Sequence, residues 1–583
     1  MKVVEVVKHQ AMRFVKKCTT REGIFGDYDY KYLFVPEVPF FSKEHKTQPF
    51  FGVDADMPIF LGFILGFQHA LSMLAGVVTP PILIAGVANL LPQITQYLVL
   101  ASLIISGLLS MVQITRVRLF KGYYMGTGLL TMVGTSFASI AVVTKAFPMM
   151  YELGDCPIAA DGTQLPCPDG YGKILALAVI CSLLEIALSF TPARILQLVF
   201  PNIVTGPVVL LIGTHLIETG MTDWLGGSAC HGTDTVCHIG GHDKPWGLAQ
   251  YIGLGFLVYV TILLSERFGS PIMKSCAVII GLLIGCIVAA AADYFDGLSI
   301  GLAPAATFVW VHTFKLELYG PAILPFLAVR LVLMMEAIGD ITATSDVLRQ
   351  PTEGLLYETR IQGGLLADGI NGIISGLGTV TPTSTFAQNN GVISVTKCAN
   401  LTVGYWCAGF MLIMGIFSKF AAAIVTIPKP VLGGMTSFLF CSVAIAGVKI
   451  ISTTPFTRRD RFLLTASVLP GMGAILLPNW FEHVFTYKGS NNALKGFFNA
   501  IVLVMQTGFA ITGFIGVILN QFLPQVGDEA EEIEEVVLET VGSAGQDGRN
   551  LYASKENDKL QTFNPNHTLV EYLGTQSSNE HER

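Results

Sequence analysis

Long apolar runs recur along this chain and constrain its fold more than any other feature. Short loops with Pro, Gly or charge separate them, and 52% of all residues are hydrophobic whereas only 13% are charged. A bilayer crossing takes about 20 apolar residues, so the stretch from Met57 to Phe522 has room for about fourteen crossings. The regular apolar runs begin near Met57, Pro81, Lys173, Pro201, Gly247, Pro271, Pro321, Leu401, Ile427, Phe462 and Ala493. We therefore predict an all-α polytopic membrane protein and exclude a soluble enzyme with a single anchor.

The two ends of the chain differ from this apolar body. Residues 1–56 mix Lys, Glu, Asp and aromatic residues without the short apolar core of a secretory signal, so we expect the first span to direct insertion. Residues 524–583 contain an acidic run, Asp528 to Glu539, that is typical of a solvated, disordered tail. The sequence thus predicts a cytoplasmic N-terminal segment (1–56), a transmembrane domain (57–523) and a cytoplasmic acidic tail (524–583).

Two stretches are apolar enough to enter the membrane but too rich in Gly, Thr and Ser to be simple helices. They are Gly122–Ala146 and Gly376–Lys397, and Thr-Ser-Phe at 135–137 in the first is answered by Ser-Thr-Phe at 384–386 in the second. Extended backbone at membrane depth is tolerated only where it faces protein or a water-filled cavity. Such paired irregular segments indicate an inverted-repeat transporter with its site near the midplane.

The distribution of Lys and Arg predicts the orientation. Basic loops belong on the cytoplasmic side, and they carry Arg116, Arg118 and Lys121 and, before a later span, Arg458, Arg459 and Arg461. The acidic loop Glu152–Asp169 is then outside, and both termini are cytoplasmic.

Eleven cysteines are scattered along the chain and lack metal-ligand spacing, so we expect no metal site. Two pairs, Cys156 with Cys167 and Cys230 with Cys237, lie in loops predicted to be extracellular. Disulfides persist there, but free thiols are an equal alternative at this point.

Two acids in one apolar run are candidates for proton coupling. Glu336 and Asp340 are four residues apart, so both carboxyl groups lie on one face of a helix. Neighbouring acids in a low dielectric cannot both be ionised cheaply, so one is expected to hold a proton. The alternative is that Asp340 merely ends the helix near the membrane interface.

Other polar groups inside apolar surroundings are candidates for a binding site. Asp368 would bond to the second broken stretch or cap a helix, and His69 is either a satisfied interior side chain or part of the site. The run Phe386–Gly391 contains amides, which offer both a donor and an acceptor to a planar heterocycle. Phe137, at the matching place in the first stretch, would stack on such a ring or serve only as core.

The decapeptide Gln388–Lys397 resembles the signature of the nucleobase–ascorbate transporter family in every defined position. The resemblance extends from about residue 20 to about residue 523 and also rests on Gln68-His69, on Glu336 with Gly339-Asp340, and on Ala367–Asn371. Further segments are similar to the fungal urate–xanthine branch: Thr19–Gly23, Gly26–Tyr30 and Pro455–Arg459. Lys397 stands where that branch commonly has Arg, and the two cations are not equivalent in bidentate binding.

This resemblance implies a fold and a mechanism. The fold would have about fourteen segments in two inverted halves of about seven each, with short β-strands in the third and tenth segments. A core subdomain would slide against a gate subdomain in an elevator-type alternating-access cycle, and the gate helices would form a homodimer. The implied activity is proton-coupled uptake of xanthine or urate across the plasma membrane, with protons as coupling ion and no other cofactor, enzyme activity or nucleic-acid partner.

The resemblance also implies roles for individual residues. Substrate would be held by Phe137, Glu336, the backbone of Ala387 and Gln388. The site would be supported by His69, Asp368, Phe386, Asn389, Asn390, Gly391, Thr396 and Lys397, and Asp340 would assist Glu336 in proton coupling. Selectivity would be filtered at the gate by Arg461, Thr507 and Phe509. A neutral Gln388 leaves Glu336 as the main acid at the substrate and so tolerates an anionic purine.

Two other functions remain open from the sequence. A carrier of a small anion would share the architecture, although such carriers bind their ion at facing helix ends. A membrane receptor that binds purine without moving it is the second alternative, whereas an enzyme has no visible nucleophile, metal set or phosphate loop.

Overall fold

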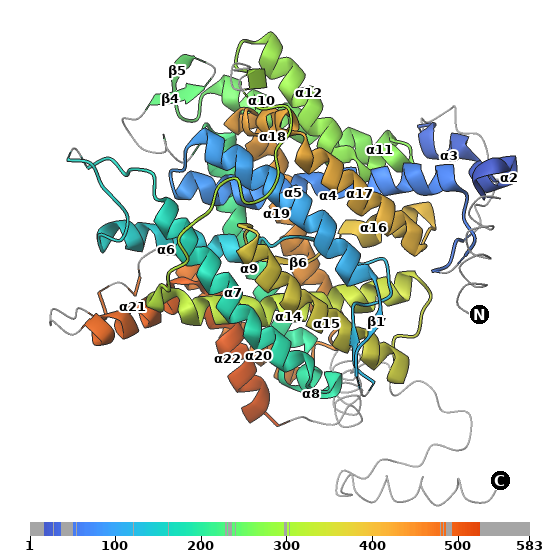
Figure 1. Cartoon of the computed structure of the whole chain (residues 1–583). Coiled ribbons are helices and arrows are strands. Elements are labelled where there is room, and N and C mark those ends of the chain that lie inside the picture. Colours follow the sequence, from blue (N-terminus) through green and yellow to red (C-terminus); the bar gives the residue numbers. More distant parts are fainter. Residues whose placement is uncertain are drawn as a thin grey trace, which may run out of the picture. The chain divides into compact units, whose positions relative to one another are not determined.

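Long helices form most of this computed structural model (Figure 1). A helix satisfies its own backbone hydrogen bonds, which is why apolar segments in lipid adopt it. The structure describes residues 17–524 apart from 27, 37–49, 54, 121, 161, 228–229, 231–235, 240, 296–299, 302, 387, 478–479, 482 and 486–491. The acidic run Asp528–Glu539 lies outside the described residues.

The first half of the chain contains four helices of more than twenty residues and several shorter ones. They are α2 (Arg21–Ile24), α3 (Tyr30–Phe34), α4 (Ile59–Val87), α5 (Pro92–Ile114), α6 (Ala138–Glu152), α7 (Pro168–Ser189), α8 (Ala193–Val199), α9 (Asn202–Trp224), α10 (Ala249–Phe268), α11 (Pro271–Ser275) and α12 (Ala277–Ala291).

The second half begins with a short 3-10 turn and continues with helices of similar length. They are η2 (Gly320–Ala322), α14 (Ile323–Val347), α15 (Leu355–Leu377), α16 (Gln388–Thr396), α17 (Leu401–Ile416), α18 (Ser418–Val425), α19 (Lys429–Ile451), α20 (Arg458–Leu476), α21 (Asn492–Gln506) and α22 (Gly508–Phe522).

Three short two-stranded antiparallel sheets accompany the helices in the described part of the chain. The strands are β1 (Val117–Arg118), β2 (Tyr124–Met125), β3 (Val133–Thr135), β4 (Val236–Ile239), β5 (His242–Pro245) and β6 (Thr383–Thr385). Both stretches predicted to be broken contain one strand of the β3–β6 pair followed by a helix, α6 or α16.

Within the described residues, seven helices are long and apolar enough to cross a membrane, or up to nine if each bent pair counts as one span. The bent pairs are α17 with α18, at 79°, and the Phe497–Gln506 part of α21 with α22, at 92°. The chain is therefore a multi-pass membrane protein. The prediction of about fourteen segments also counted broken ones such as β3–α6 and β6–α16, whose helices are too short to cross alone.

The prediction that a new run begins near Pro81 is wrong. Helix α4 continues through Pro80 and Pro81 to Val87. A proline removes the hydrogen bond to the carbonyl four residues earlier, which here frees the carbonyls of Gly76 and Val77. The Thr135 hydroxyl of β3 lies 3.3 Å from the first carbonyl oxygen and 2.8 Å from the second, so a distant segment satisfies what the prolines leave open.

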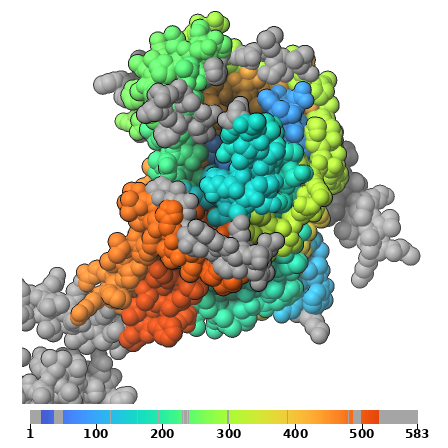
Figure 2. Space-filling view, turned by 90° about the vertical axis from the view of Figure 1, so that its left-hand side faces the viewer, coloured from blue at the N-terminus to red at the C-terminus, as the bar shows by residue number. Residues whose placement is uncertain are grey.

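The helices pack in groups that bring distant parts of the sequence together. Helix α7 packs along α15 and α14, α4 packs against α5 and α17, and α9 packs along α19 and against α22. Figure 2 shows the segments from α20 to α22, in orange and red, gathered on one side of the surface. Leu469, Phe514 and Phe522 are 72%, 68% and 82% exposed there, as expected of side chains that face lipid.

Both cysteine pairs that the sequence left open are disulfides in the structure. Cys156 is bonded to Cys167, with Cα atoms 5.4 Å apart, and Cys230 is bonded to Cys237, with Cα atoms 5.1 Å apart. Each bond closes a short loop next to the end of a helix, α6 or α9.

Candidate functional site

The β3–β6 pair joins the two broken stretches at the centre of the candidate site. Gly134 pairs with Ser384 in the antiparallel register. The ladder is extended at both ends, because Ser136 N–H donates to the Pro382 carbonyl at 2.8 Å and Phe386 N–H donates to the Met132 carbonyl at 2.9 Å. Helices α6 and α16 begin within three residues of these strands, so the N-termini of two short helices lie beside one small sheet.

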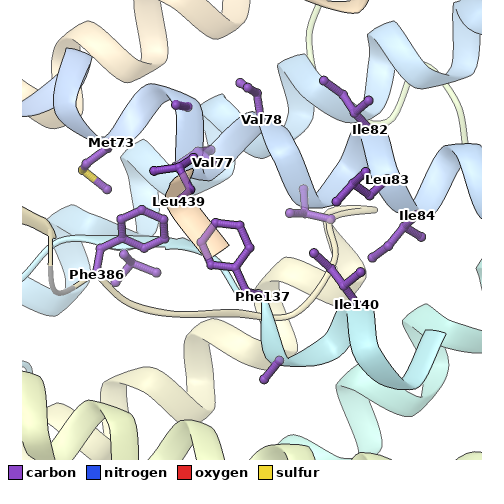
Figure 3. Packing of buried hydrophobic residues seen from close by; sticks show 14 of the residues in the cluster. Met73, Val77, Val78, Ile82, Leu83, Ile84, Phe137, Ile140, Phe386 and Leu439 are labelled. Atoms are coloured by element: carbon purple, nitrogen blue, oxygen red, sulfur yellow. The ribbon is translucent and has the colours of Figure 1, made fainter. Parts of the chain in front are cut away.

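Two phenylalanines flank this sheet (Figure 3). Phe137 and Phe386 are 9% and 7% exposed, and their ring centroids are 6.5 Å apart. Phe137 also meets Phe440 of α19 edge-on, at 5.5 Å between centroids. A Cβ added at Gly134 would lie 2.5 Å from the Phe386 ring, so only glycine allows the ring to cover the strand. Phe386 packs against the sheet, and Phe137 lies between it and α19.

The two acids of α14 are brought to the strand β6. Asp340 is 9% exposed and lies inside the helix, which continues to Val347, so it does not end the helix. The Thr385 hydroxyl donates to Asp340 Oδ2 at 2.9 Å. Glu336, one turn earlier, is partly buried, and within the described ranges only the charges of Asp340 and Asp368, and no hydrogen bond, act on its carboxylate. Glu336 is therefore free to bind a ligand.

Asp368 approaches the same strand from α15. It is fully buried, and the Ser384 hydroxyl donates to its Oδ2 at 3.2 Å. Consecutive strand residues point to opposite sides, so Ser384 reaches α15 while Thr385 reaches α14. Asp368 thus bonds to the broken segment, the first of the two roles that the sequence left open.

Helix α16 carries the signature residues, and they have different environments. Asn389 is buried beside His69 of α4, without a hydrogen bond of standard geometry to any described residue. Asn390 accepts a hydrogen bond from the Thr344 hydroxyl at 2.7 Å, which ties α16 to α14. Gln388, the first residue of the helix, is partly buried and follows the end of β6 by three residues.

The remaining signature positions lie at the edge of this group. Gly391 and Lys397 are exposed, and Lys397 ends the helix with a φ of 54°. Thr396 is buried, and its hydroxyl donates to the Val392 carbonyl at 2.8 Å. Ala387 lies outside the described residues.

The three residues predicted for the gate are not equivalent in the structure. Thr507 and Phe509 are 3% and 2% exposed at the sharp bend between α21 and α22. Phe509 lines an apolar cavity of about 180 Å³, together with Leu331, Val332 and Met335 of α14 and Val204 and Val208 of α9. Arg461 is exposed in the first turn of α20 and does not line this cavity.

Sequence reasoning missed one charged pair close to the site. Arg330 of α14 and Glu185 of α7 are both fully buried, and Nη1 of the arginine lies 3.5 Å from Oε2 of the glutamate. Both residues interrupt apolar runs, so the rule that intramembrane charges are functional candidates could have found them. Arg330 lies less than two turns before Glu336 on the same helix.

Apolar spans, a central pair of discontinuous segments and buried acids that converge on it define a multi-pass membrane transporter. The model of the Permease family (Xan_ur_permease) matches residues 62–480. The chain therefore belongs to this family of permeases, the nucleobase–ascorbate transporters.

Several relatives support this assignment. The chain is 56% identical over 537 residues to a purine permease of Emericella nidulans, covering 91% of this chain and 92% of the relative. It is 51% identical over 556 residues to the uric acid-xanthine permease of the same organism, covering 95% and 96%. The xanthine permease XanP of Escherichia coli is 31% identical over 470 residues, covering 78% and 90%.

A solved structure has a similar fold. The murine solute carrier 26 family member A9, an anion transporter in the inward-facing state, matches with a TM-score of 0.50 at 10% identity, covering 81% of this chain and 71% of that chain. This likeness concerns the fold alone.

Proposed function

We propose that this permease carries oxidised purines, xanthine or urate or both, into the cell with protons. The observation that carries the proposal is the β3–β6 pair, which gathers Phe137, the start of α16 at Gln388 and the acids of α14. The relatives named above as purine, uric acid-xanthine and xanthine permeases support the same class of substrate.

The chemistry of the site suits a planar, polar heterocycle. The Glu336 carboxyl accepts hydrogen bonds when ionised and donates one when protonated, while the Gln388 amide both donates and accepts. Phe137 offers a ring for stacking at the edge of the sheet. The N-termini of α6 and α16 add partial positive charge, which favours the electron-rich oxygens of an oxopurine.

The different surroundings of the two α14 acids support proton coupling. Asp340 receives a hydrogen bond from Thr385, whereas Glu336 receives none from the described side chains. Glu336 therefore gains most from a bound substrate, and a proton on it would be taken up with the purine and released on the inner side. Plasma-membrane residence and cytoplasmic termini belong to this proposal.

The cavity at Phe509 suggests how the site moves. It lies between α14, which bears the acids, and the helices α9 and α22, which α14 also contacts directly. An apolar, imperfectly filled contact costs little to rearrange, so α14 with β3, β6 and α16 would slide as a core against a gate that contains α9 and α22. The exposed apolar faces of the gate helices would contact lipid and the second subunit of a homodimer.

Purified protein in liposomes provides the test. We expect labelled xanthine to accumulate in the liposomes when the outside is more acidic. Uptake should stop when the proton gradient is collapsed in the presence of sodium, and excess sulfate or bicarbonate should not affect it. Binding without accumulation would mean a receptor. Accumulation that persists without a proton gradient would refute proton coupling, and inhibition by bicarbonate would favour an anion carrier.

A further inference from the structure

A cluster of three buried ionic groups lies behind the proposed site, on the side of β6 that faces α15. Arg330 is 1% exposed, and its two terminal nitrogens face Glu185 Oε2 at 3.5 Å and the Ala178 carbonyl of α7 at 3.2 Å. Asp368 is 0% exposed on α15. One cation thus faces two acids in a region that excludes water.

The two carboxyl groups of this cluster face each other. Glu185 and Asp368 lie within reach of a hydrogen bond between their side chains. Each uses one oxygen elsewhere, because Glu185 Oε2 faces Arg330 and Asp368 Oδ2 accepts from Ser384. The other two, Glu185 Oε1 and Asp368 Oδ1, are buried and have no hydrogen-bond donor among the described residues. Two facing acceptors cannot bond unless one of them carries a hydrogen.

The backbone holds the two carboxyl groups together. Helices α7 and α15 approach closely through small residues, since a Cβ added at Gly369 would lie 3.0 Å from the Ile186 nitrogen. A Cβ at Gly372 would lie 2.6 Å from Arg330 Nη1. Small residues of this kind allow membrane helices to pack at short distance. The carboxyl groups therefore cannot relieve their contact by moving apart without separating two helices.

We propose that Glu185 and Asp368 share one proton between Glu185 Oε1 and Asp368 Oδ1, and that Arg330 balances the single negative charge that remains. The cluster is then neutral overall, and every oxygen has a partner. Without the proton, two buried carboxylates would face one guanidinium, and the excess charge would be costly at this depth.

Other charged groups near α15 do not replace this proton. On the elements that pack against α15, the charged groups are Asp169, Lys173, Glu185, Arg194, Arg330, Glu336, Asp340 and Asp346, and the other titratable groups are Tyr97, Tyr124, Tyr171 and Cys181. Lys173 lies more than three turns before Glu185 on α7 and pairs with Asp155. Arg194 pairs with Glu358 at 3.4 Å in an exposed position, and Tyr124 lies under Arg116. Glu336 and Asp340 only add negative charge. Arg330 is thus the cation available to the pair within the described part of the chain.

The shared proton is a fixed part of the protein and does not travel with substrate. Glu185, Arg330 and Asp368 are buried from solvent, whereas Glu336 is partly exposed. The neutral cluster joins α7, α14 and α15, and through Ser384 it positions β6. Glu185 and Arg330 are accordingly positioning residues for the proposed site. This inference is independent of the substrate and of proton coupling.

Infrared spectroscopy of the purified full-length protein tests the proposal, with Glu185→Gln as the main variant. The amide oxygen can accept from Arg330 while its nitrogen donates to Asp368, so the variant should fold and keep an unchanged pH profile of uptake. The spectrum should lose one protonated carboxyl band, identified by its shift in deuterated water, and keep the same carboxylate signal. Glu353→Gln, an exposed loop position, is the matched control and should lose carboxylate signal only.

Two further variants test charge and donor separately. Glu185→Leu leaves Asp368 Oδ1 without a donor and should have a lower Tm than Glu185→Gln. Arg330→Met removes the cation, so both acids should become protonated, which adds one carboxyl band and makes the variant more stable as the pH falls. Loss of carboxylate signal in Glu185→Gln, failure of that variant to fold, or equal carboxyl bands in wild type and Arg330→Met would each overturn the proposal.

Discussion

The hydrogen bond from Thr385 to Asp340 offers a sharp test of the site, because the same strand supplies its control. In Thr385→Val the shape of the side chain is kept, but Asp340 Oδ2 loses the donor that lies at 2.9 Å. A hydrogen bond to a charged group contributes about 1.5–3 kcal/mol, and each 1.4 kcal/mol is a factor of ten. If the bond acts mainly in the transport-competent state, proton-driven uptake should fall by roughly 10- to 100-fold.

The control is the identical change two residues earlier. Thr383 is also fully buried, but its hydroxyl has no hydrogen-bond partner among the described residues. Removing an unpartnered buried hydroxyl costs nothing in hydrogen bonding, so Thr383→Val should be neutral or slightly stabilising. Thr385→Ser keeps the donor and should retain most of the uptake that Thr385→Val loses.

Both variants would be purified, compared by thermal unfolding, and reconstituted at equal protein density for initial-rate uptake of labelled xanthine under a pH gradient. A fall in uptake for Thr385→Val at nearly unchanged Tm is the expected result. Wild-type uptake in both valine variants would refute the role of this hydrogen bond. An equal loss in both would show that any change in β6 is damaging, and that Asp340 is not the reason.

Three other changes probe the packing and chemistry of the site. Gly134→Ala places a Cβ 2.5 Å from the Phe386 ring and should reduce uptake strongly. In the control Gly409→Ala the new Cβ has no neighbouring atom within 4 Å, so uptake should be unchanged. Equal effects of the two changes would contradict the packing argument. Glu336→Gln should abolish proton-driven accumulation of xanthine, and normal accumulation would exclude its coupling role. Gln388→Glu should weaken the binding of urate more than the binding of xanthine in competition assays, because a second carboxylate repels the urate anion. Equal weakening of both would argue against this.

Local composition was enough to find the two broken segments. Dense Gly, Thr and Ser in otherwise apolar stretches indicated extended backbone, and the structure has the strands β3 and β6 there. The partners of the two acids could not be predicted. Ser384 and Thr385 are chemically alike, and only the alternation of a strand placed between α15 and α14 sends one to Asp368 and the other to Asp340.

The wrong prediction that a new run begins near Pro81 has the same cause, namely a hydrogen-bond partner from a distant segment. The local rule that proline ends a helix holds when the freed carbonyls have no other partner. In this protein the partner is Thr135, more than fifty residues later in the sequence, and the sequence of α4 alone does not indicate it. Predictions from sequence are weakest where a polar group is satisfied by a segment distant in the chain.

The strand β6 therefore binds two aspartates whose surroundings differ. On one side Ser384 holds Asp368, whose charge is balanced by Arg330 and, in our proposal, by a proton shared with Glu185. On the other side Thr385 holds Asp340, next to Glu336, whose carboxylate has no comparable hydrogen bond from the residues that the structure describes. If the first side stays neutral throughout the cycle, a change of protonation can act on β6 from α14 only. The strand and α16 would then respond to one proton site, which is what coupling of a single substrate to proton movement requires.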